Sequence, residues 1–304
     1  MKQTILALTF GILIFGNAIS QPFEKSKADS LRDAGNLKLA IEEYAKLYEQ
    51  DSTNGNNTYN YAAALALDRQ IDTAFHFLNI ATDKDTSVQV LNDPDFYFLI
   101  GDDRWSKLQD KIINRVEAKY GKYQDVELSK ELWTMQIKDQ AFYYHIDVAE
   151  RTVGRESPII SALGELKKII NDQNLNRIIE IIDAQGWPKK SVVEGSAATT
   201  VFLIIQHSDI EIQKKYLPLM KEAANNGEAD WSLLALLIDR VNIREGKKQI
   251  YGSQITRNED GSFSVKDLQD PEYVNQRRKE VGLEPIEEYV SRWGIKWTIE
   301  QKEK

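Results

Sequence analysis

The feature of this sequence that most constrains its fold is a self-similarity at a spacing of 34 residues. The segment GNLKLAIEEYAKLYEQD (35–51) aligns with RQIDTAFHFLNIATDKD (69–85). A repeat of this period is built from helix pairs that cannot bury their apolar faces alone, so neighbouring units must stack. The matched positions are Leu37 and Ile71, Ala40 and Ala74, Ile41 and Phe75, Tyr44 and Leu78, and Asp51 and Asp85.

The repeat resembles the tetratricopeptide family, in which a small residue lets two helices approach closely. NTYNYAAALALDR (57–69) would be the first helix of the second repeat, although Arg69 stands where the family usually has glycine. Residues 93–113 would be a closing helix. The resemblance implies a groove that binds a peptide or protein over residues 21–120. Because so short an array needs further support, a purely supporting role remains the alternative.

Residues 1–20 predict a signal peptide. A lysine precedes an apolar run from Ile5 to Phe15, and Ala18 and Ser20 are small residues at the spacing that signal peptidase recognises. The run is short for a membrane span, so we expect cleavage after Ser20, a periplasmic or secreted protein, and no membrane span thereafter. An uncleaved anchor is the alternative. The chain contains no cysteine, which excludes disulfides, thiolate metal sites and a lipid anchor on cysteine.

Charge and motif content exclude several classes of function. The formal net charge of −8 repels nucleic acid phosphates, so we expect no nucleic acid partner. Neither a P-loop nor a GxGxxG motif is present, and no cofactor is predicted. The histidines His76, His145 and His207 lie far apart without an HExxH motif, so no metal site is predicted. Ser196 lies outside any GxSxG motif and is interpreted as a helix N-cap.

A second domain, mostly helical with a small β-hairpin, is predicted over residues 125–295. The overall fold is therefore expected to be mostly α, a short helical repeat followed by this domain. Further helices are expected from Pro158, over 175–186, over 197–207 and over 233–246. The first helix of the domain carries one apolar stripe, formed by Leu128, Leu132, Met135, Phe142 and Ile146.

Asp139 lies on that apolar stripe. A carboxylate on the apolar face of a helix is costly unless it is paired or hydrogen-bonded. Its presence indicates either a buried structural ion pair or a functional carboxylate, and the pattern alone leaves both open.

Two strongly apolar helices end in adjacent polar residues. The helix over 197–207 ends in Gln206 and His207, and the helix over 233–246 continues into Asp239 and Arg240, with Arg244 one turn later. Asp239 and Arg240 point about 100° apart on a helix, so they should reach separate partners. Two buried helices that end in polar groups predict a common polar site.

The segment GKKQIYGSQITRNEDGSFSV (246–265) predicts a β-hairpin that forms one wall of this site. NEDG supplies the turn. Gln249, Tyr251 and Ser253 would share one face of the first strand, with Gly252 and Gln254 on the other. A glycine in a strand suits close approach of a ligand to the backbone.

The motifs GWP, QH, YLPLM, DR, REG, QIYGSQ, RR and VGLEPIEEYV occur in this order over residues 125–293. Together they resemble a bacterial family described only as a domain of unknown function, and Asp139-Gln140 fits its early helix. The resemblance brings no established reaction. It implies functional positions at Gln206, His207, Asp239, Arg240, Gly246, Gln249, Tyr251, Gly252 and Gln254.

Three functions fit these residues. A binding or scaffolding protein would use arginines to hold an anionic group and Gln249 and Gln254 to recognise amides or sugars of a peptide, glycan or envelope protein. An enzyme, hydrolase-like, would use His207 as a general base oriented by Asp139 or Asp239. Alternatively, the polar residues form an internal network that fastens the hairpin to the helices.

Overall fold

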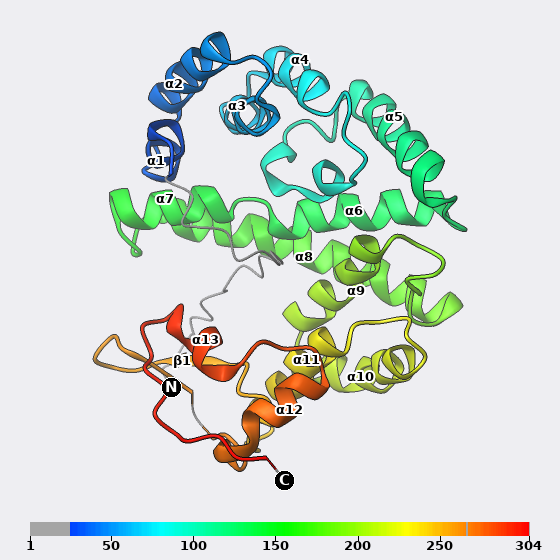
Figure 1. The fold of residues 1–304 in the computed structure, drawn as a ribbon, viewed down its shortest axis with the longest axis vertical. Coiled ribbons are helices and arrows are strands. Elements are labelled where there is room, and N and C mark those ends of the chain that lie inside the picture. The colour runs from blue at the N-terminus through cyan, green and yellow to red at the C-terminus, as the bar shows by residue number, and fades with distance from the viewer. Residues whose placement is uncertain (1–24, 266, 304) are drawn as a thin grey trace.

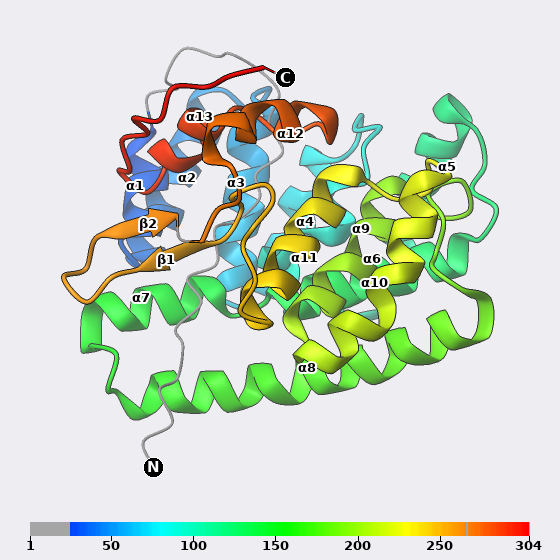
Figure 2. The same cartoon turned by 90° about the horizontal axis from the view of Figure 1, so that it is seen from below.

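The computed structural model describes residues 25–265 and 267–303, so the predicted signal peptide lies outside the described residues. The fold is mostly helical with a short two-stranded antiparallel hairpin, which confirms the predicted fold class. An arc of helices, α1–α5, lies on one side of α6–α8, and the elements from α9 onward lie on the other side (Figure 1). The view from below shows α8 running beside α7 along one edge of the molecule (Figure 2).

In the arc, short connections join α1 to α4, and a longer segment with two 3-10 helices leads from α4 to α5. Alanines at the contacts between helices are almost fully buried, which lets the backbones approach closely. The elements are α1 (Lys27–Asp33), α2 (Leu37–Gln50), α3 (Gly55–Leu67), α4 (Ile71–Ala81), η1 (Gln89–Asn92), η2 (Pro94–Phe96) and α5 (Asp103–Tyr120).

The 34-residue spacing recurs in the backbone. Gly35 and Arg69 stand at equivalent positions, and both adopt a left-handed conformation, with φ of 84° and 60°. The next residue in each turn donates to the carbonyl five residues earlier, in both cases at 2.9 Å. Arg69 thus takes up the conformation that glycine favours, and its guanidinium lies 4.4 Å from the centre of the Phe98 ring.

The predicted closing helix over 93–113 is wrong in its first half. Residues 93–102 form η2 and a turn, and α5 begins only at Asp103, because the Asp102 carboxylate caps the helix by accepting from Arg104 N. Phe96 is fully buried against the inner side of the arc, and Tyr59 Oη donates to Asp93 at 2.6 Å. The chain itself therefore packs against the inner side of the arc, and one apolar core joins the arc to α6 and α9.

The middle of the chain forms α6 (Val126–Gln140), α7 (Tyr143–Val153) and α8 (Pro158–Gln185). The predicted stripe is interrupted, because Phe142 adopts a left-handed conformation with φ of 70° and separates α6 from α7. The two helices expected between 158 and 186 are one helix of 28 residues. The polar residues in its middle do not break it, since Asn174 Nδ2 donates to the Met135 carbonyl of α6 at 3.1 Å.

The remaining elements cover the second side of α6–α8. The N-cap of α9 is Glu194 and not Ser196, whose hydroxyl instead accepts from Trp133 Nε1 at 2.9 Å. The elements are α9 (Gly195–His207), α10 (Ile210–Asn225), α11 (Trp231–Arg244), β1 (Ile255–Arg257), β2 (Phe263–Val265), η3 (Pro271–Tyr273), α12 (Val274–Glu280) and α13 (Ile286–Ser291).

The hairpin is shorter than the sequence predicts. Ile255 pairs with Val265 and Arg257 with Phe263, and the predicted NEDG turn joins the strands. Residues 249–254 were expected to be a strand, but only Gln249 forms a single parallel bridge, with Leu268, and residues 250–254 form a loop. A loop is favoured here because main-chain N–H groups of residues 250–254 bond to the side chains of Asp239 and Gln249 and not to a second strand.

Candidate functional site

Asp139 and His207 form a buried pair between the ends of α6 and α9. His207 Nδ1 lies 3.1 Å from Asp139 Oδ1, and the two side chains are 7% and 1% exposed. Gln140 Nε2 donates to the other carboxylate oxygen at 2.5 Å. Burial alone would raise the pKa of Asp139, but the hydrogen bond and charge of His207 and the hydrogen bond from Gln140 lower it below its ordinary value. An ionised Asp139 thus orients the imidazole, with Nε2 on the side of the ring away from the carboxylate.

Lys167 joins this pair from α8. The residue is only 9% exposed, and its Nζ donates to the main-chain carbonyl of Asp139 at 2.6 Å and lies 3.5 Å from that of Ala141. The ammonium also lies 4.0 Å from the centre of the Tyr143 ring, a cation–π contact. Tyr143 is the first residue of α7, so α6, α7, α8 and α9 all contribute to one polar cluster.

Arg240 links the end of α9 to the loop that follows α11. Its Nη1 donates to the Gln206 carbonyl at 3.1 Å, and its Nε donates to Gln254 Oε1 at 3.2 Å. Arg244, one turn later, donates to the Ser208 carbonyl at 2.9 Å. Burial, together with the charge of Arg244, lowers the pKa of Arg240 to about 10. The two arginines thus bind carbonyls at the C-terminal end of α9, where positive charge is favoured.

Asp239 faces a different direction, as the helical geometry predicts. Its fully buried carboxylate accepts from three main-chain amides, those of Ile250 at 2.6 Å, Tyr251 at 3.1 Å and Ser253 at 2.9 Å. Burial raises the pKa of Asp239, and these N–H groups offset part of the rise. The carboxylate is therefore bound by the loop backbone, and the histidine is oriented by Asp139 and not by Asp239.

The carbonyls of the same loop are also bound by side chains. Three carbonyls of residues 250–253 accept from Arg277 Nε, Arg278 Nη1 and Tyr289 Oη, at 2.8, 2.7 and 2.6 Å. Arg278 is almost fully buried, with its guanidinium 4.7 Å from the centre of the Tyr289 ring. The adjacent arginines of α12 and Tyr289 of α13 thus bind the carbonyls of the loop and fix its conformation.

Gln249 and Gly252 complete this loop. The amide of Gln249 bonds both main-chain groups of Gln254, donating to its carbonyl at 3.0 Å and accepting from its N–H at 2.7 Å. Gly252 has φ of 68°, and a Cβ there would lie 3.1 Å from Ile286 Cδ1. Packing against α13 and a left-handed backbone therefore explain the glycine.

The structure thus divides the polar residues into two groups, which share Gln254. The polar cluster consists of Asp139, Tyr143, Lys167, Gln206, His207, Arg240, Arg244 and Gln254. The loop network consists of Asp239, Gln249, Arg277, Arg278 and Tyr289 around residues 250–254, and it includes the predicted residues Tyr251 and Gly252.

Sequence reasoning missed Lys167 and Tyr143. A signal for Lys167 exists, because it shares the buried face of α8 with Ile170, Asn174 and Ile178 at helical spacing. A lysine on such a face has the same diagnostic value as the aspartate on the stripe of α6. Tyr143 has no comparable signal, since its position depends on the break between α6 and α7.

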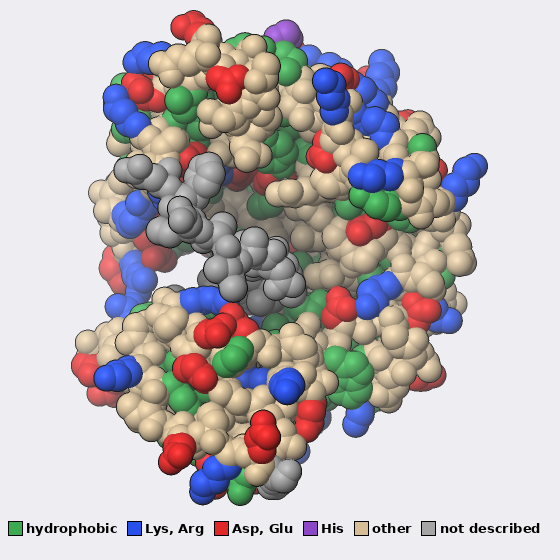
Figure 3. Space-filling view, viewed as in Figure 1, with side chains coloured by type: hydrophobic (Ala, Val, Ile, Leu, Met, Phe, Trp, Pro, Cys, Tyr) green, Lys and Arg blue, Asp and Glu red, His purple; other side chains and the backbone are tan. Residues whose placement is uncertain are grey.

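The surface of the molecule is hollowed between the arc and the C-terminal elements, and charged side chains of both signs border the hollow (Figure 3). Within the polar cluster, Tyr143 and Gln254 are partly exposed, whereas Asp139 and Lys167 are buried. Among the residues that the structure describes, no three His, Asp or Glu side chains gather as a metal ion would require.

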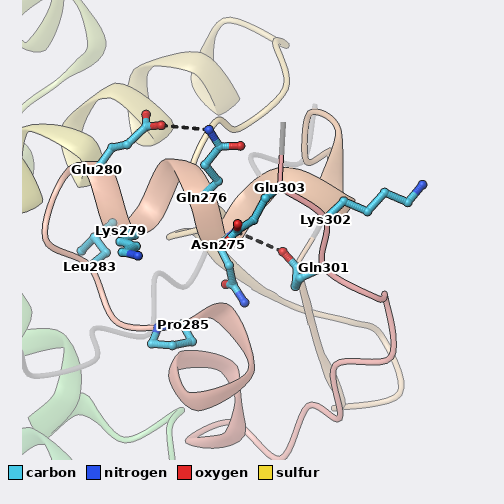
Figure 4. Close-up of a pocket in the computed structure, with 9 residues that line it drawn as sticks. All are labelled: Asn275, Gln276, Lys279, Glu280, Leu283, Pro285, Gln301, Lys302 and Glu303. Atoms are coloured by element: carbon cyan, nitrogen blue, oxygen red, sulfur yellow. Dashed lines mark hydrogen bonds between the residues drawn. The ribbon is translucent and has the colours of Figure 1, made fainter.

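A second hollow, an open groove of about 760 Å³, lies between α12 and the C-terminal tail (Figure 4). Asn275 N donates to Gln301 Oε1 at 3.0 Å and Gln276 Nε2 to Glu280 at 3.3 Å. Charged side chains of both signs line it, with no residue of the polar cluster among them. The groove is therefore separate from the predicted site.

Comparison with known protein families gives a match to the C-terminal part of the chain. A family model described as a family of unknown function (DUF6624) matches residues 126–298. No curated protein and no solved structure matches the chain in these comparisons. Over the part of the chain that the structure describes, we find no helix with the length and apolar character needed to cross a membrane.

Proposed function

We propose that this chain, which belongs to the family of unknown function DUF6624, is an exported binding protein whose ligand site is the polar cluster. The role is argued from the chain's own residues. Export is supported by the leader-like composition of residues 1–20. The observation that carries the binding role is the Asp139–His207 pair at 3.1 Å, to which four helices bring further polar groups. Convergent polar side chains between helices are typical of a ligand site.

The residues in the polar cluster suit recognition of a polar ligand. His207 is held through Nδ1 in a side chain that is 7% exposed, so a ligand that reaches the imidazole would do so at Nε2. Tyr143 and Gln254, both partly exposed, add a hydroxyl and an amide, which are groups that bind peptides and sugars. The motif residues of the loop network have a different role in this proposal, because they hold residues 249–254 in place beside the cluster.

The geometry of the pair also favours a second candidate, a hydrolase-like enzyme. When a neutral imidazole donates from Nδ1 to a carboxylate, its lone pair lies on Nε2, which is the arrangement of a general base. In this case His207 would remove a proton from water or a hydroxyl nucleophile, and Asp139 would stabilise the imidazolium that forms.

For residues 25–120, we propose tetratricopeptide-like repeats that support the C-terminal domain and bind no peptide in their groove. Two observations favour support. The buried Phe96 and the Tyr59–Asp93 hydrogen bond occupy the inner side of the arc, and Tyr144 of α7 donates to the Arg32 carbonyl at 2.9 Å. A groove occupied by the chain itself leaves little surface for a peptide.

His207→Asn tests the proposal. The asparagine amide can still donate to Asp139 but lacks the second ring nitrogen, so the fold should be kept while the ligand contact is lost. Wild-type protein, His207→Asn and the control His76→Asn, at an exposed histidine, would each be immobilised and exposed to envelope extract, and retained molecules identified by mass spectrometry. We expect at least one molecule to be retained by wild type and control and lost with His207→Asn.

The same proteins separate the two candidates. Turnover of chromogenic ester, amide or glycoside substrates by wild type but not by His207→Asn would favour the enzyme. An identical set of retained molecules on all three proteins, with no turnover, would contradict both functions and leave the polar cluster as an internal network.

A further inference from the structure

The tail, residues 294–303, follows α13 and is anchored near its end. Gln301 accepts from Asn275 N of α12 at 3.0 Å and donates to the Pro271 carbonyl at 3.1 Å. Lys302 N donates to the Glu272 carbonyl of η3 at 2.7 Å. These bonds hold the tail beside α12, along the outer edge of the molecule (Figure 2).

The tail has the alternating exposure of an extended chain. Ile295 and Trp297 pack against the small apolar core of α12 and α13, whereas Lys296 and Thr298 are exposed. Ile299 falls on the inward phase of this alternation, yet it is 40% exposed and belongs to no apolar cluster of the described residues. The tail therefore carries an apolar side chain that the described part of the chain does not cover.

The main chain of the tail also has an unused edge. Over 298–303, the main-chain groups that form hydrogen bonds with described residues are the Lys302 N–H and the Ile299 carbonyl, which accepts from Gln301 Nε2 at 3.1 Å. Successive residues of an extended chain direct their main-chain groups to opposite sides, so those of Gln301 and Glu303 lie on the side away from η3. Such an edge can pair with another extended chain.

The charges of the tail are complementary to those of a second copy. Two tails that pair antiparallel about Gln301 place Glu300 of each copy opposite Lys302 of the other. Because the main-chain bonds form at Gln301, Glu300 and Lys302 occupy the intervening positions, where opposite side chains approach most closely. Among the described residues no side chain binds either of them, and the Lys302 side chain extends away from α12 (Figure 4).

The same pairing brings the exposed isoleucine to the groove beside α12. It sets Ile299 of the second copy opposite Glu303, which lines this open groove of about 760 Å³. Opposite residues of an antiparallel pair project from the same face. Leu283 and Pro285 also line the groove and offer apolar surface. The second copy would thus cover the side chain that the chain itself leaves exposed.

We propose that two copies of this chain associate through antiparallel pairing of their tails, centred on Gln301. The contact is isologous, since each tail gives and receives the same bonds. It goes beyond the proposed ligand site and does not depend on it, because no residue of the tail belongs to the polar cluster. The interface consists of two short strands, so the dimer should be weak and form only at high protein concentration.

Sedimentation equilibrium at low salt tests the pairing, because exposed charges are screened at high salt. The variants are Glu300→Lys and Lys302→Glu, each of which makes both cross-strand pairs like-charged. The control is Lys296→Glu. Lys296 is exposed on the same tail but lies opposite no described residue of the second copy, so the control changes the net charge as Lys302→Glu does. Far-UV circular dichroism of each protein checks the fold.

We expect wild type and Lys296→Glu to form a reversible dimer at concentrations up to about 1 mM. Glu300→Lys and Lys302→Glu should each associate at least about 10-fold more weakly, although they change the net charge in opposite directions. An equimolar mixture of Glu300→Lys and Lys302→Glu should associate as wild type does, since each tail of one variant then faces opposite charges on the other.

Three results would overturn the inference. Wild type that stays monomeric over this range has no such contact. A dimer that Glu300→Lys and Lys302→Glu leave unchanged, or that Lys296→Glu weakens as much as they do, is held by another surface or by net charge alone. Two weakened variants whose mixture does not regain association would contradict the antiparallel register.

Discussion

Asp239→Asn tests whether the loop network fastens residues 249–254 to α11. The carboxylate accepts from Ile250 and Tyr251 on one oxygen and from Tyr251 and Ser253 on the other. Asparagine can replace only one of these oxygens, because its amide nitrogen is itself a donor and would oppose an N–H group.

The magnitude follows from the hydrogen bonds that are lost. A hydrogen bond to a charged acceptor contributes about 1.5–3 kcal/mol, and a buried donor left without an acceptor costs about 1–3 kcal/mol. Burial raises the folded-state pKa of Asp239, so ionisation of this carboxylate opposes folding and offsets part of the stabilisation that its hydrogen bonds give. We therefore expect Asp239→Asn to lower the free energy of unfolding by about 2–4 kcal/mol.

Urea unfolding at pH 7, followed by circular dichroism, measures this change. Asp230→Asn is the control, because Asp230 precedes the same helix and pairs with Lys190 at the surface, where an ion pair contributes about 0–1 kcal/mol. If Asp239→Asn and Asp230→Asn lower stability equally, the carboxylate does not fasten the loop, and the role assigned to the loop network is wrong.

Two further substitutions test single contacts. In thermal unfolding, Gly252→Ala should lower stability by about 1–2 kcal/mol for the left-handed backbone, with a further loss for the close contact with Ile286. Gly282 has a similar φ but open space around it, so Gly282→Ala should show only the backbone cost. Equal losses would argue against tight packing of α13 on the loop. Because the folded-state pKa of Asp139 is lowered, its carboxylate stabilises the fold above the unfolded-state pKa of about 3.9, and this contribution disappears as the pH falls through the lower folded value. The urea midpoint of wild type should thus fall more steeply below about pH 4 than that of Asp139→Asn, and parallel profiles would mean that the pair with His207 does not stabilise the ionised form.

Helix type and position were predictable where periodicity and capping agree. The start of α8 at Pro158, its end before Gly186 and the end of α11 near Gly246 follow from apolar spacing with Pro or Gly at the expected positions, although the sequence divided α8 into two helices. The break at Phe142 was not predictable, because a phenylalanine in a left-handed conformation has no sequence signal. The loop over 250–254 was mistaken for a strand because its main-chain N–H groups bond to the carboxylate of Asp239, a contact that depends on tertiary structure and cannot be read from the alternation of polar residues.

The site was predictable in part for the same reasons. Asp139 was visible as a carboxylate on an apolar stripe, and its partner at the end of α9 follows only from the packing of the two helices. Lys167 and Lys168 are identical neighbours in sequence, and only the helical phase of α8 buries the first and exposes the second. Residue types alone therefore identified the polar groups but could not divide them between the polar cluster and the loop network.

Amide hydrogen exchange at residues 250–253 tests that division most directly, because the account assigns Asp239 to the loop and Asp139 to the ligand site. We predict that Asp239→Asn accelerates exchange at the amides of Ile250, Tyr251 and Ser253, whereas Asp139→Asn leaves their rates at the wild-type values. Equal acceleration by both substitutions would contradict the account, since it would show that the polar cluster and the loop network act as one structural unit.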